Sequence, residues 1–350
     1  MFSGFLTDTR KRIETYLSDI PGKEFPGLPK IRNHSESPIE DLITYTLNGK
    51  MLRGALCRIG FELLSGEHDD RVTALGAAVE LVQSAFLIHD DIMDRDTVRR
   101  GRPAMHAAWQ NRAEEKGIPD SVHLGESLAI CLGDLALFTA FGIIADTCGK
   151  DAGGITGLFS RDLSTVAGAQ MLDTMYGAGW MEVSEEDILS LYINKTGRYT
   201  FAIPLSAGAL LAGGAPGIRG KLERAGDLLG IAFQLKDDEL GLFGDGQQLG
   251  KPVGSDVREG KKTLYYLRLK AAGSAAGKLP ELFGKADTTE QEVLQIRKRI
   301  EDLGIHRDIA ELARSRTGEA LTIIRDLEGV REAPRKLLAE LAEYNLVRAR

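Results

Sequence analysis

Two short runs of aspartate in this 350-residue chain offer the oxygen ligands that divalent cations bind. The first run is Asp90-Asp91-Ile92-Met93-Asp94. Asp90 and Asp94 are four residues apart and therefore share one face of a helix, with Asp91 about 100° around it. Like charges at this spacing repel, so we expect a cation between them, although one such run alone fits a solvated acidic face equally well.

A second acidic run weakens that alternative. It is Phe233-Gln234-Leu235-Lys236-Asp237-Asp238, and it ends an apolar helical pattern that must be buried. Two buried helices that each end in paired aspartates can face one another across a bundle, which is how helical bundles build sites for two or three metals. Mg²⁺ binds through one or two carboxylates together with phosphate oxygens of a substrate, so the two runs predict a site for Mg²⁺ and a phosphorylated ligand.

Basic residues accompany these runs. Lys50 and Arg53 are three apart and project from one face of a helix, and Arg99-Arg100 follow the first run. Arginine presents a planar fork to phosphate oxygens and lysine a point charge. Each would be a solvated side chain if it stood alone, but with two aspartate runs they predict that the chain binds anionic oxygens. Further candidates are Lys195, Lys251 and Lys261.

The elements that must position these residues have the helical period, because apolar residues recur every three or four positions in almost every long segment. Helices are predicted over 38–65, 71–95, 121–146, 156–179, 185–212, 220–240, 290–303 and 306–328. The breaks between them are too short for interdomain linkers, so we predict an all-α, single-domain bundle of about ten or more helices over residues 1–350. Residues 244–262 are rich in glycine and charge, which predicts a mobile loop beside a functional site.

Composition narrows the class of protein. With 44 basic and 51 acidic residues the formal charge is −7, which argues against a nucleic-acid partner. Three cysteines without metal-ligand spacing indicate reduced thiols and a cytoplasmic protein. The segment 128–145 approaches the length of a bilayer span but has Asp134 near its middle, so we predict a helix buried on all sides and no transmembrane span.

From about Pro38 to about Lys262, the order and spacing of these motifs resemble those of the trans-isoprenyl diphosphate synthases, also called polyprenyl synthases. The first run with Arg99-Arg100 is similar to the family's DDxxD motif followed by RRG, and Gly49-Lys50-xx-Arg53 is similar to its isopentenyl diphosphate anchor. The other matches are Gln83 at the same anion site, Gln170-Met171-Leu172-Asp173 for GQxLD, Lys195-Thr196 for KT, 233–238 for the second aspartate motif, and Gly250-Lys251 through 260–263 for the closing loop.

The sequence also departs from the family pattern. Gly241 stands where the second motif has its third aspartate, and Ala169 replaces the glycine of GQxLD. Asn48 and Gly54 replace the more usual glycine and proline around the anchor. Because Gly241 has no carboxylate, the second metal site would depend on Asp237, with Asp238 and a water in support.

The resemblance implies the all-α isoprenoid synthase fold around a central cavity, with a motif-bearing core over 38–263 and C-terminal helices over 264–350. It implies a homodimeric transferase that elongates an allylic diphosphate with isopentenyl diphosphate and uses three Mg²⁺ ions per active site. The implied metal ligands are Asp90, Asp94 and Asp237, with Asp91, Asp173 and Asp238 in support. Arg99, Lys195 and Lys251 would stabilise the departing pyrophosphate, and Gln170 and Lys261 would complete the substrate-binding set.

The resemblance also implies roles for the second substrate and the allylic cation. Isopentenyl diphosphate would be held by Lys50, Arg53, Gln83 and Arg100. Thr196 and Gln234 would offer dipoles to the cation. No side chain is an evident base, and the family's usual candidate is the released pyrophosphate.

Product length depends on residues one helical turn before the first motif. The growing tail is expected to run from Asp90 toward the start of its helix and to meet Ala85 and Phe86, about 5.4 Å from the metals. A small residue at 85 and a large one at 86 favour the twenty-carbon product, geranylgeranyl diphosphate. Farnesyl diphosphate and the longer farnesylgeranyl diphosphate remain alternatives, because Leu81 and Val82 in the next layer are not especially bulky.

Other functions remain open on the sequence alone. A class I terpene cyclase also carries DDxxD on a helical bundle, but it needs no second diphosphate anchor such as Lys50 and Arg53. A regulatory subunit of a heteromeric synthase would have lost a motif, and Gly241 is the one hint of such a loss. An all-helical scaffold would leave both aspartate runs and the basic residues as coincidence.

Overall fold

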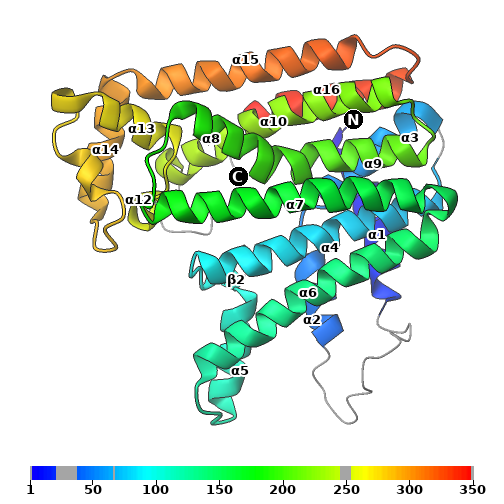
Figure 1. Cartoon of the computed structure of the whole chain (residues 1–350), viewed down its shortest axis with the longest axis horizontal. Helices are drawn as coiled ribbons and strands as arrows, with labels where there is room; N and C mark the ends of the chain where they lie inside the picture. The colour runs from blue at the N-terminus through cyan, green and yellow to red at the C-terminus, as the bar shows by residue number, and fades with distance from the viewer. Residues whose placement is uncertain (1, 21–37, 66–67, 245–253, 348–350) are drawn as a thin grey trace. The chain divides into compact units, whose positions relative to one another are not determined.

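The computed structural model describes residues 2–20, 38–65, 68–244 and 254–347. Helices make up nearly all of this described part, which confirms the all-α prediction (Figure 1). Its one sheet is a two-strand antiparallel ladder, β1 (Val98–Arg99) with β2 (Arg102–Pro103). The contacts between residues divide the chain into two compact units. That residues 1–350 form a single domain stays a prediction.

Unit 1 comprises Met1–Leu158, Pro204–Ala215 and Arg331–Leu337. It contains the sheet, the start of α7 (Ala152–Gly177), the 3-10 turn η1 (Gly149–Asp151) and α9 (Ile203–Leu211), together with α1 (Phe2–Ser18), α2 (Pro38–Leu47), α3 (Leu52–Ser65), α4 (Asp70–Met93), α5 (Met105–Glu115) and α6 (Ser121–Thr147).

Helix α4 is the central element of unit 1. It packs against α6, α3 and α1, and its buried residues include Val72, Leu75, Val79 and Val82. Each such side chain contributes roughly 1.5–3 kcal/mol when it is removed from water. The N-terminus of α4 is capped by Asp69, whose carboxylate accepts the backbone N–H of Arg71. Packing on several sides thus fixes the helix that ends in the first aspartate motif.

Helix α6 corrects one prediction. The segment 128–145 lies within it but is not buried on all sides: one face packs on α4 and α5, while Phe138 is 74% exposed and Ile130 47% exposed. Helical period cannot reveal an uncovered face when nearly every residue is apolar. In the described part of the chain, α4 and α6 are the two helices long and apolar enough to cross a membrane by length and composition alone.

Unit 2 comprises Phe159–Ile203, Pro216–Val330 and Leu338–Arg350. Its elements, besides the rest of α7 and two 3-10 turns, η3 (Gly273–Ala275) and η4 (Leu279–Leu282), are α8 (Glu185–Leu191), η2 (Tyr192–Ala202), α10 (Pro216–Phe243), α12 (Ser255–Glu259), α13 (Leu264–Ala271), α14 (Glu290–Asp302), α15 (Ile305–Arg325) and most of α16 (Glu332–Val347).

The core of unit 2 forms around α10, which packs chiefly against η2 and α15. Ile188, Leu235, Tyr265, Ile296 and Ile309 are members of one buried cluster that joins α8, α10, α13, α14 and α15. Helices α8 and α14 each begin with a reciprocal capping box, which satisfies backbone donors at their first turn.

Two predicted segments contain more structure than the sequence indicated. The helix predicted over 38–65 is two helices, because the chain leaves helical geometry at Asn48–Met51, where Met51 has a φ of +56°. Within the loop predicted over 244–262, residues 255–259 form the one-turn helix α12, flanked by Gly254 and Gly260 at positive φ. Residues 245–253, and with them Lys251, lie outside the described residues.

Candidate active site

The first aspartate motif occupies the last turn of α4. Asp91 is fully buried, whereas Asp90 and Asp94 are partly exposed. The backbone N–H of Asp94 bonds to the carbonyl of Asp90 at 2.8 Å, so the helical turn that joins the two residues is complete. The motif therefore has one carboxylate turned into the protein and two that reach solvent.

Asp91 forms a buried ion pair with Arg99. The Nε atom of Arg99 donates to Oδ1 of Asp91 at 2.7 Å, and the same guanidinium lies 3.3 Å from Asp96 and 3.9 Å from Asp90. Burial raises the pKa of Asp91 to about 6, although the hydrogen bond from Arg99 acts in the opposite direction. Arg99 thus holds the buried carboxylate of Asp91 in place and puts a positive charge beside the motif.

The hairpin after α4 explains the sequence Arg99-Arg100-Gly101. Arg100 and Gly101 both have positive φ, +54° and +72°, as the two central residues of a tight type I′ hairpin turn do. Strands β1 and β2 flank them, with Arg99 opposite Arg102. The turn therefore directs two neighbouring arginines to different partners. Arg99 donates to Asp91, and the guanidinium of Arg100 lies beside Gly49 in the break between α2 and α3.

The predicted anchor residues gather around a buried glutamate that sequence reasoning missed. Glu80, on α4, accepts the backbone N–H of Gly54 at 2.8 Å and interacts electrostatically with Arg53 and Arg100. Burial raises the pKa of Glu80, and the positive charge of Arg53 opposes this. A proline at position 54 would lack the N–H that Glu80 accepts, which gives a physical reason for glycine there.

The other two anchor residues differ in exposure. Gln83 lies one turn from Glu80 on α4, is 6% exposed, and its buried Oε1 has no hydrogen-bond partner within the described residues. Lys50 is exposed in the break between α2 and α3. Unit 1 thus brings Arg53 and Arg100 to Glu80 in the middle of α4, with Gln83 one turn along the helix and Lys50 in the break before α3.

The second aspartate motif lies near the end of α10, in unit 2, and its buried member is Asp238. Asp238 accepts hydrogen bonds from the hydroxyl of Tyr192 and from Nε2 of Gln234, the latter at 3.0 Å. Burial raises the pKa of Asp238 to about 7, and the charge of Asp256 adds to this rise. Asp237, the preceding residue, is partly exposed.

Tyr192 connects three elements of unit 2 and was not anticipated from the sequence. Its hydroxyl donates to Asp238 on α10 and accepts the backbone N–H of Leu264, the first residue of α13, at 3.4 Å. The tyrosine is 5% exposed. No motif marks it, since its partners are 46 and 72 residues away in the chain.

The KT motif lies in η2, whose 11 residues wind as a π-helix. Lys195 forms an ion pair with Asp173 of the GQxLD motif, and the hydroxyl of Thr196 donates to Oε1 of Gln234 at 2.8 Å. Gln170, one turn before Asp173 on α7, is partly buried. Unit 2 therefore joins the KT, GQxLD and second aspartate motifs into one network, and π-helical turns of this kind are frequent at functional sites.

A glycine pair sets the distance between the KT motif and α10. A Cβ atom at Gly230 would overlap the Cα atom of Gly197, so η2 and α10 cross with their backbones in contact. One turn along from that crossing, Thr196 reaches Gln234. A Cβ atom at Gly197 would make only ordinary van der Waals contacts, so Gly230 is the position at which a larger residue would push the two helices apart.

The predicted chain-length residues line α4 just before the first motif. Ala85, Leu81 and Val82 are buried, and Phe86 is partly exposed. His89, one residue before the motif, packs against Gly133 of α6, with Nε2 3.1 Å from the carbonyl of Ile130. This contact holds the ring of His89 against α6.

The carboxylates present suit Mg²⁺. No three side chains of His, Cys, Asp or Glu in the described ranges form a metal-ligand group by themselves. Mg²⁺ requires no such group, because it binds one or two carboxylates and takes its other oxygens from water and phosphate. Asp90 and Asp94 in unit 1 and Asp237 in unit 2 are the partly exposed aspartates, whereas Asp91 and Asp238 are buried and accept hydrogen bonds from protein donors.

Lys261, a predicted substrate-binding residue, pairs with Glu259 at 2.9 Å and lies 3.8 Å from Asp256.

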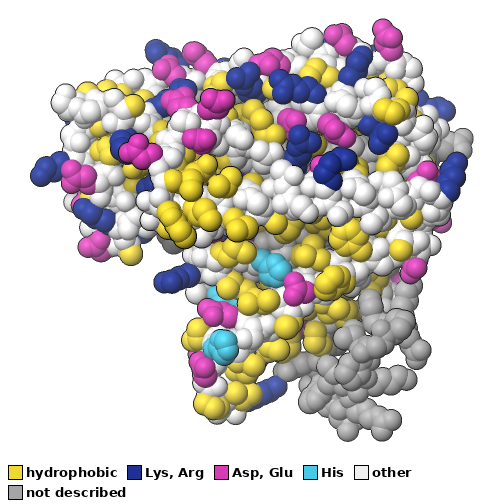
Figure 2. Space-filling view, in the orientation of Figure 1, with side chains coloured by type: hydrophobic (Ala, Val, Ile, Leu, Met, Phe, Trp, Pro, Cys, Tyr) yellow, Lys and Arg dark blue, Asp and Glu magenta, His cyan; other side chains and the backbone are white. Residues whose placement is uncertain are grey.

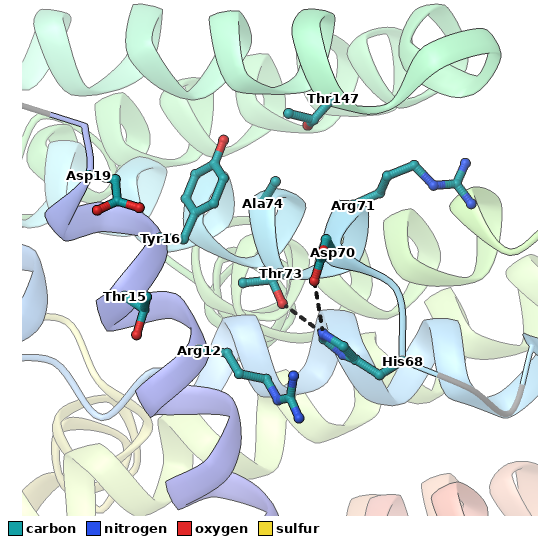
Figure 3. Close-up of a pocket in the computed structure, with 10 residues that line it drawn as sticks. All are labelled: Arg12, Thr15, Tyr16, Asp19, His68, Asp70, Arg71, Thr73, Ala74 and Thr147. Carbon is teal, nitrogen blue, oxygen red and sulfur yellow. Dashed lines mark hydrogen bonds and ion pairs between the residues drawn. The ribbon is translucent and has the colours of Figure 1, made fainter. Parts of the chain in front are cut away.

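A cavity of about 650 Å³ lies at the opposite end of α4 from the first motif (Figure 3). It is lined by residues of α1 and of the start of α4, among them Arg12, Tyr16 and Arg71. His68 projects into it and lies 3.3 Å from Thr73 and 3.7 Å from Asp70. None of the predicted site residues lines this cavity.

The fold is the all-α isoprenoid synthase fold, as comparison with solved structures shows. A geranylgeranyl pyrophosphate synthase from Corynebacterium glutamicum, complexed with isoprenyl diphosphate and magnesium, matches with a TM-score of 0.85 and 30% identity over 99% of each chain. A sequence model of the polyprenyl synthetase family matches residues 36–300, and the chain belongs to this family.

Curated relatives agree with this assignment. A geranylgeranyl diphosphate synthase of Sulfolobus acidocaldarius is 31% identical over 322 residues, 87% of this chain and 88% of the relative. A (2E,6E)-farnesyl diphosphate synthase of Mycobacterium tuberculosis is 30% identical over 301 residues, 85% of this chain and 79% of the relative. Family membership therefore does not by itself choose between these products.

The hydroxyl of Tyr192 gives a testable prediction. Tyr192→Phe removes one donor from the buried Asp238, and above the carboxyl's pKa of about 7 a hydrogen bond to the charged form contributes about 1.5–3 kcal/mol. We expect the free energy of unfolding, measured by urea denaturation, to fall by about 2 kcal/mol. Tyr266→Phe, at a partly exposed position where the ring packs on Phe283, is the control and should change it by less than about 0.5 kcal/mol. Equal values for the two variants would contradict the role given to Tyr192.

Proposed function

We propose that the protein is a Mg²⁺-dependent prenyltransferase that condenses isopentenyl diphosphate with allylic diphosphates and makes geranylgeranyl diphosphate. The observation that carries this proposal is the shared design of the two aspartate motifs. Each has a buried carboxylate held by protein donors, Asp91 or Asp238, beside exposed carboxylates. A separate cationic anchor at Arg53 and Arg100 provides for a second diphosphate.

The allylic diphosphate would bind at the exposed aspartates. Asp90, Asp94 and Asp237 would hold three Mg²⁺ ions per active site, whose contribution is to neutralise the charge that develops on the departing pyrophosphate. Lys195, fixed in place by Asp173, adds positive charge of its own. Ionisation of the C–O bond would leave an allylic cation.

Isopentenyl diphosphate would bind at the anchor. Arg53 and Arg100 offer planar forks to its phosphate oxygens, Lys50 a point charge and Gln83 an amide. The buried carboxyl of Glu80 interacts electrostatically with both guanidinium groups. Fixing the diphosphate orients the double bond against the cation, and such orientation supplies several kcal/mol of the rate acceleration.

The cation must be protected until the new bond forms. The hydroxyl of Thr196 and the amide of Gln234, linked at 2.8 Å, provide dipoles, while apolar surroundings exclude water that would quench it. Loss of a proton then completes the product, and the released pyrophosphate is the acceptor that we propose. We do not assign the base to His89, whose ring nitrogen lies at the carbonyl of Ile130, or to His106, which is buried.

The twenty-carbon product is supported by the residues before the first motif. Ala85 is a small, fully buried residue about one turn before Asp90, and Phe86 follows it with a large side chain. Geranylgeranyl diphosphate synthases of Saccharolobus solfataricus and Methanosarcina mazei are 28% and 32% identical to the chain.

The exposed face of α6 supports a homodimer. Leu128, Cys131, Leu135, Phe138, Gly142 and Ala145 alternate at spacings of three and four, as in the seam of a coiled coil. Figure 2 shows hydrophobic side chains along α6 on the molecular surface. A second copy of the same helix complements such a stripe across a two-fold axis. We also place the enzyme in the cytoplasm, since Cys57, Cys131 and Cys148 are all free thiols.

The proposed reaction can be tested with purified protein, Mg²⁺, dimethylallyl diphosphate and labelled isopentenyl diphosphate. We expect geranylgeranyl diphosphate on chromatography, and EDTA should reduce the rate about a thousandfold or more because the ions supply several kcal/mol. Turnover without isopentenyl diphosphate would indicate a terpene cyclase. Condensation only with a second subunit would indicate a regulatory protein, and farnesyl diphosphate as the end product would exclude the twenty-carbon assignment.

Product length should change when the residues before Asp90 are exchanged. Phe86→Ser removes the large side chain and should lengthen the product by one isoprene unit or more. Ala85→Phe fills the space one turn before the metals and should shorten the product to fifteen carbons. The substrate assay above, with chromatography of the products, distinguishes these outcomes. Unchanged products in both variants would place the end of the tail elsewhere.

The proposed dimer can be tested at Phe138. A glutamate there puts a charge into the apolar seam, so Phe138→Glu should convert the protein to a monomer in size-exclusion chromatography with light scattering. Val347→Glu is the control, since Val347 is equally exposed, at 77% against 74%, but lies on α16. A wild-type protein that is monomeric at micromolar concentration would reject the dimer.

A further inference from the structure

The carboxylate of Asp256 lies where a side chain at position 241 would be. A Cβ atom built on Gly241 would be 2.5 Å from Oδ2 of Asp256, 3.2 Å from its Cγ and 3.6 Å from its Oδ1. Two bonds of standard length place an aspartate's own carboxylate oxygens about 2.4 Å from its Cβ. Oδ2 of Asp256 is therefore as close to that point as a carboxylate oxygen of an aspartate at 241 would be.

Position 241 belongs to the face of α10 that carries the second motif. Asp237 and Gly241 are four residues apart on a continuous helix, so they lie one turn apart on the same side. Asp256 is also close enough to Asp238 for its charge to raise the pKa of that buried carboxyl. The third acid thus reaches the motif from another element of the same unit.

Helix α12 is held in the position that brings Asp256 to α10. The backbone N–H of Gly254 donates to the carbonyl of Gly241 at 3.3 Å, and the N–H of Lys261 donates to the carbonyl of Asp256 at 3.0 Å. Gly254 and Gly260 have φ of +80° and +72°, a conformation in which glycine is favoured. The first bond thus joins the start of α12 to α10 at Gly241, and the second closes the turn that follows Asp256.

An ion pair with Lys261 is the competing explanation for Asp256. The Nζ of Lys261 lies 3.8 Å from Oδ1 of Asp256 but 2.9 Å from Glu259, so Glu259 is its nearer partner. Oδ2 of Asp256, by contrast, is directed to α10. The side chain is 21% exposed, which leaves it accessible to solvent ions.

We propose that Asp256 supplies the third carboxylate of the second aspartate motif, in place of the acid that Gly241 lacks, and holds a divalent cation on a bound diphosphate together with Asp237. This inference rests on the proposed function. Glycine at 241 leaves the carboxylate of Asp256 in this position, whereas a larger residue there would require that carboxylate to move.

The experiment moves the acid back to position 241. Binding of inorganic pyrophosphate in the presence of Mg²⁺ is measured by calorimetry in the full-length protein, without turnover. Asp256→Ser should weaken this binding about tenfold, which corresponds to about 1.4 kcal/mol. The double variant Asp256→Ser/Gly241→Asp should recover most of the affinity, whereas the matched control Asp256→Ser/Gly241→Ala fills the same space without charge and should stay weak.

Asp237→Asn serves as the reference. If Asp237→Asn weakens binding and Asp256→Ser does not, the inference about Asp256 is wrong while the proposed function stands. Recovery in the Gly241→Ala control would also reject it, because space rather than charge would then matter. If Asp237→Asn itself binds like the wild type, the metal site of the proposed function fails. Thermal unfolding without Mg²⁺ identifies any variant that has lost its fold.

Discussion

Concentrated negative charge is the constraint on which this structure depends. Each aspartate motif places neighbouring carboxylates at the end of a buried helix, where repulsion and desolvation both disfavour the ionised forms. The two units solve the problem in different ways. Arg99 neutralises Asp91 with a full positive charge, whereas Tyr192 and Gln234 satisfy Asp238 with neutral donors. In both cases one carboxylate is tied to the protein, and its neighbours are thereby held at the surface.

The anchor at Arg53 and Arg100 concentrates positive charge instead. Arg53 and Arg100 would repel one another in the absence of an anion, and both interact electrostatically with the buried carboxyl of Glu80. The carboxylate is held by the backbone N–H of Gly54, so it does not depend on the arginines for its position. Donors that are already aligned lose little free energy to reorganisation when a diphosphate binds. Local arrangement, not the net charge of −7, determines what this acidic protein attracts.

Helical period and motif spacing predicted the fold class and most elements, because both are local properties of the chain. They could not predict Glu80, Tyr192 or Asp256, whose partners lie 26, 46 and 15 residues away and are set by packing. The all-round burial expected for 128–145 failed for a related reason: a sequence of apolar residues does not reveal how many neighbours surround it. The hairpin at Arg100 and the π-helical turn at Lys195 likewise arise from backbone geometry that no residue pattern signalled.

The crossing of η2 and α10 at Gly197 and Gly230 has an evolutionary consequence. Most helix contacts are made by side chains, so compensating changes in size let the spacing between helices drift over generations. Here a Cβ atom at Gly230 would overlap the Cα atom of Gly197, and no side-chain substitution elsewhere can make room for it. The separation between Thr196 and Gln234 is therefore insulated from repacking elsewhere in the core. Product range can diversify along α4 while this part of the active site stays geometrically constant.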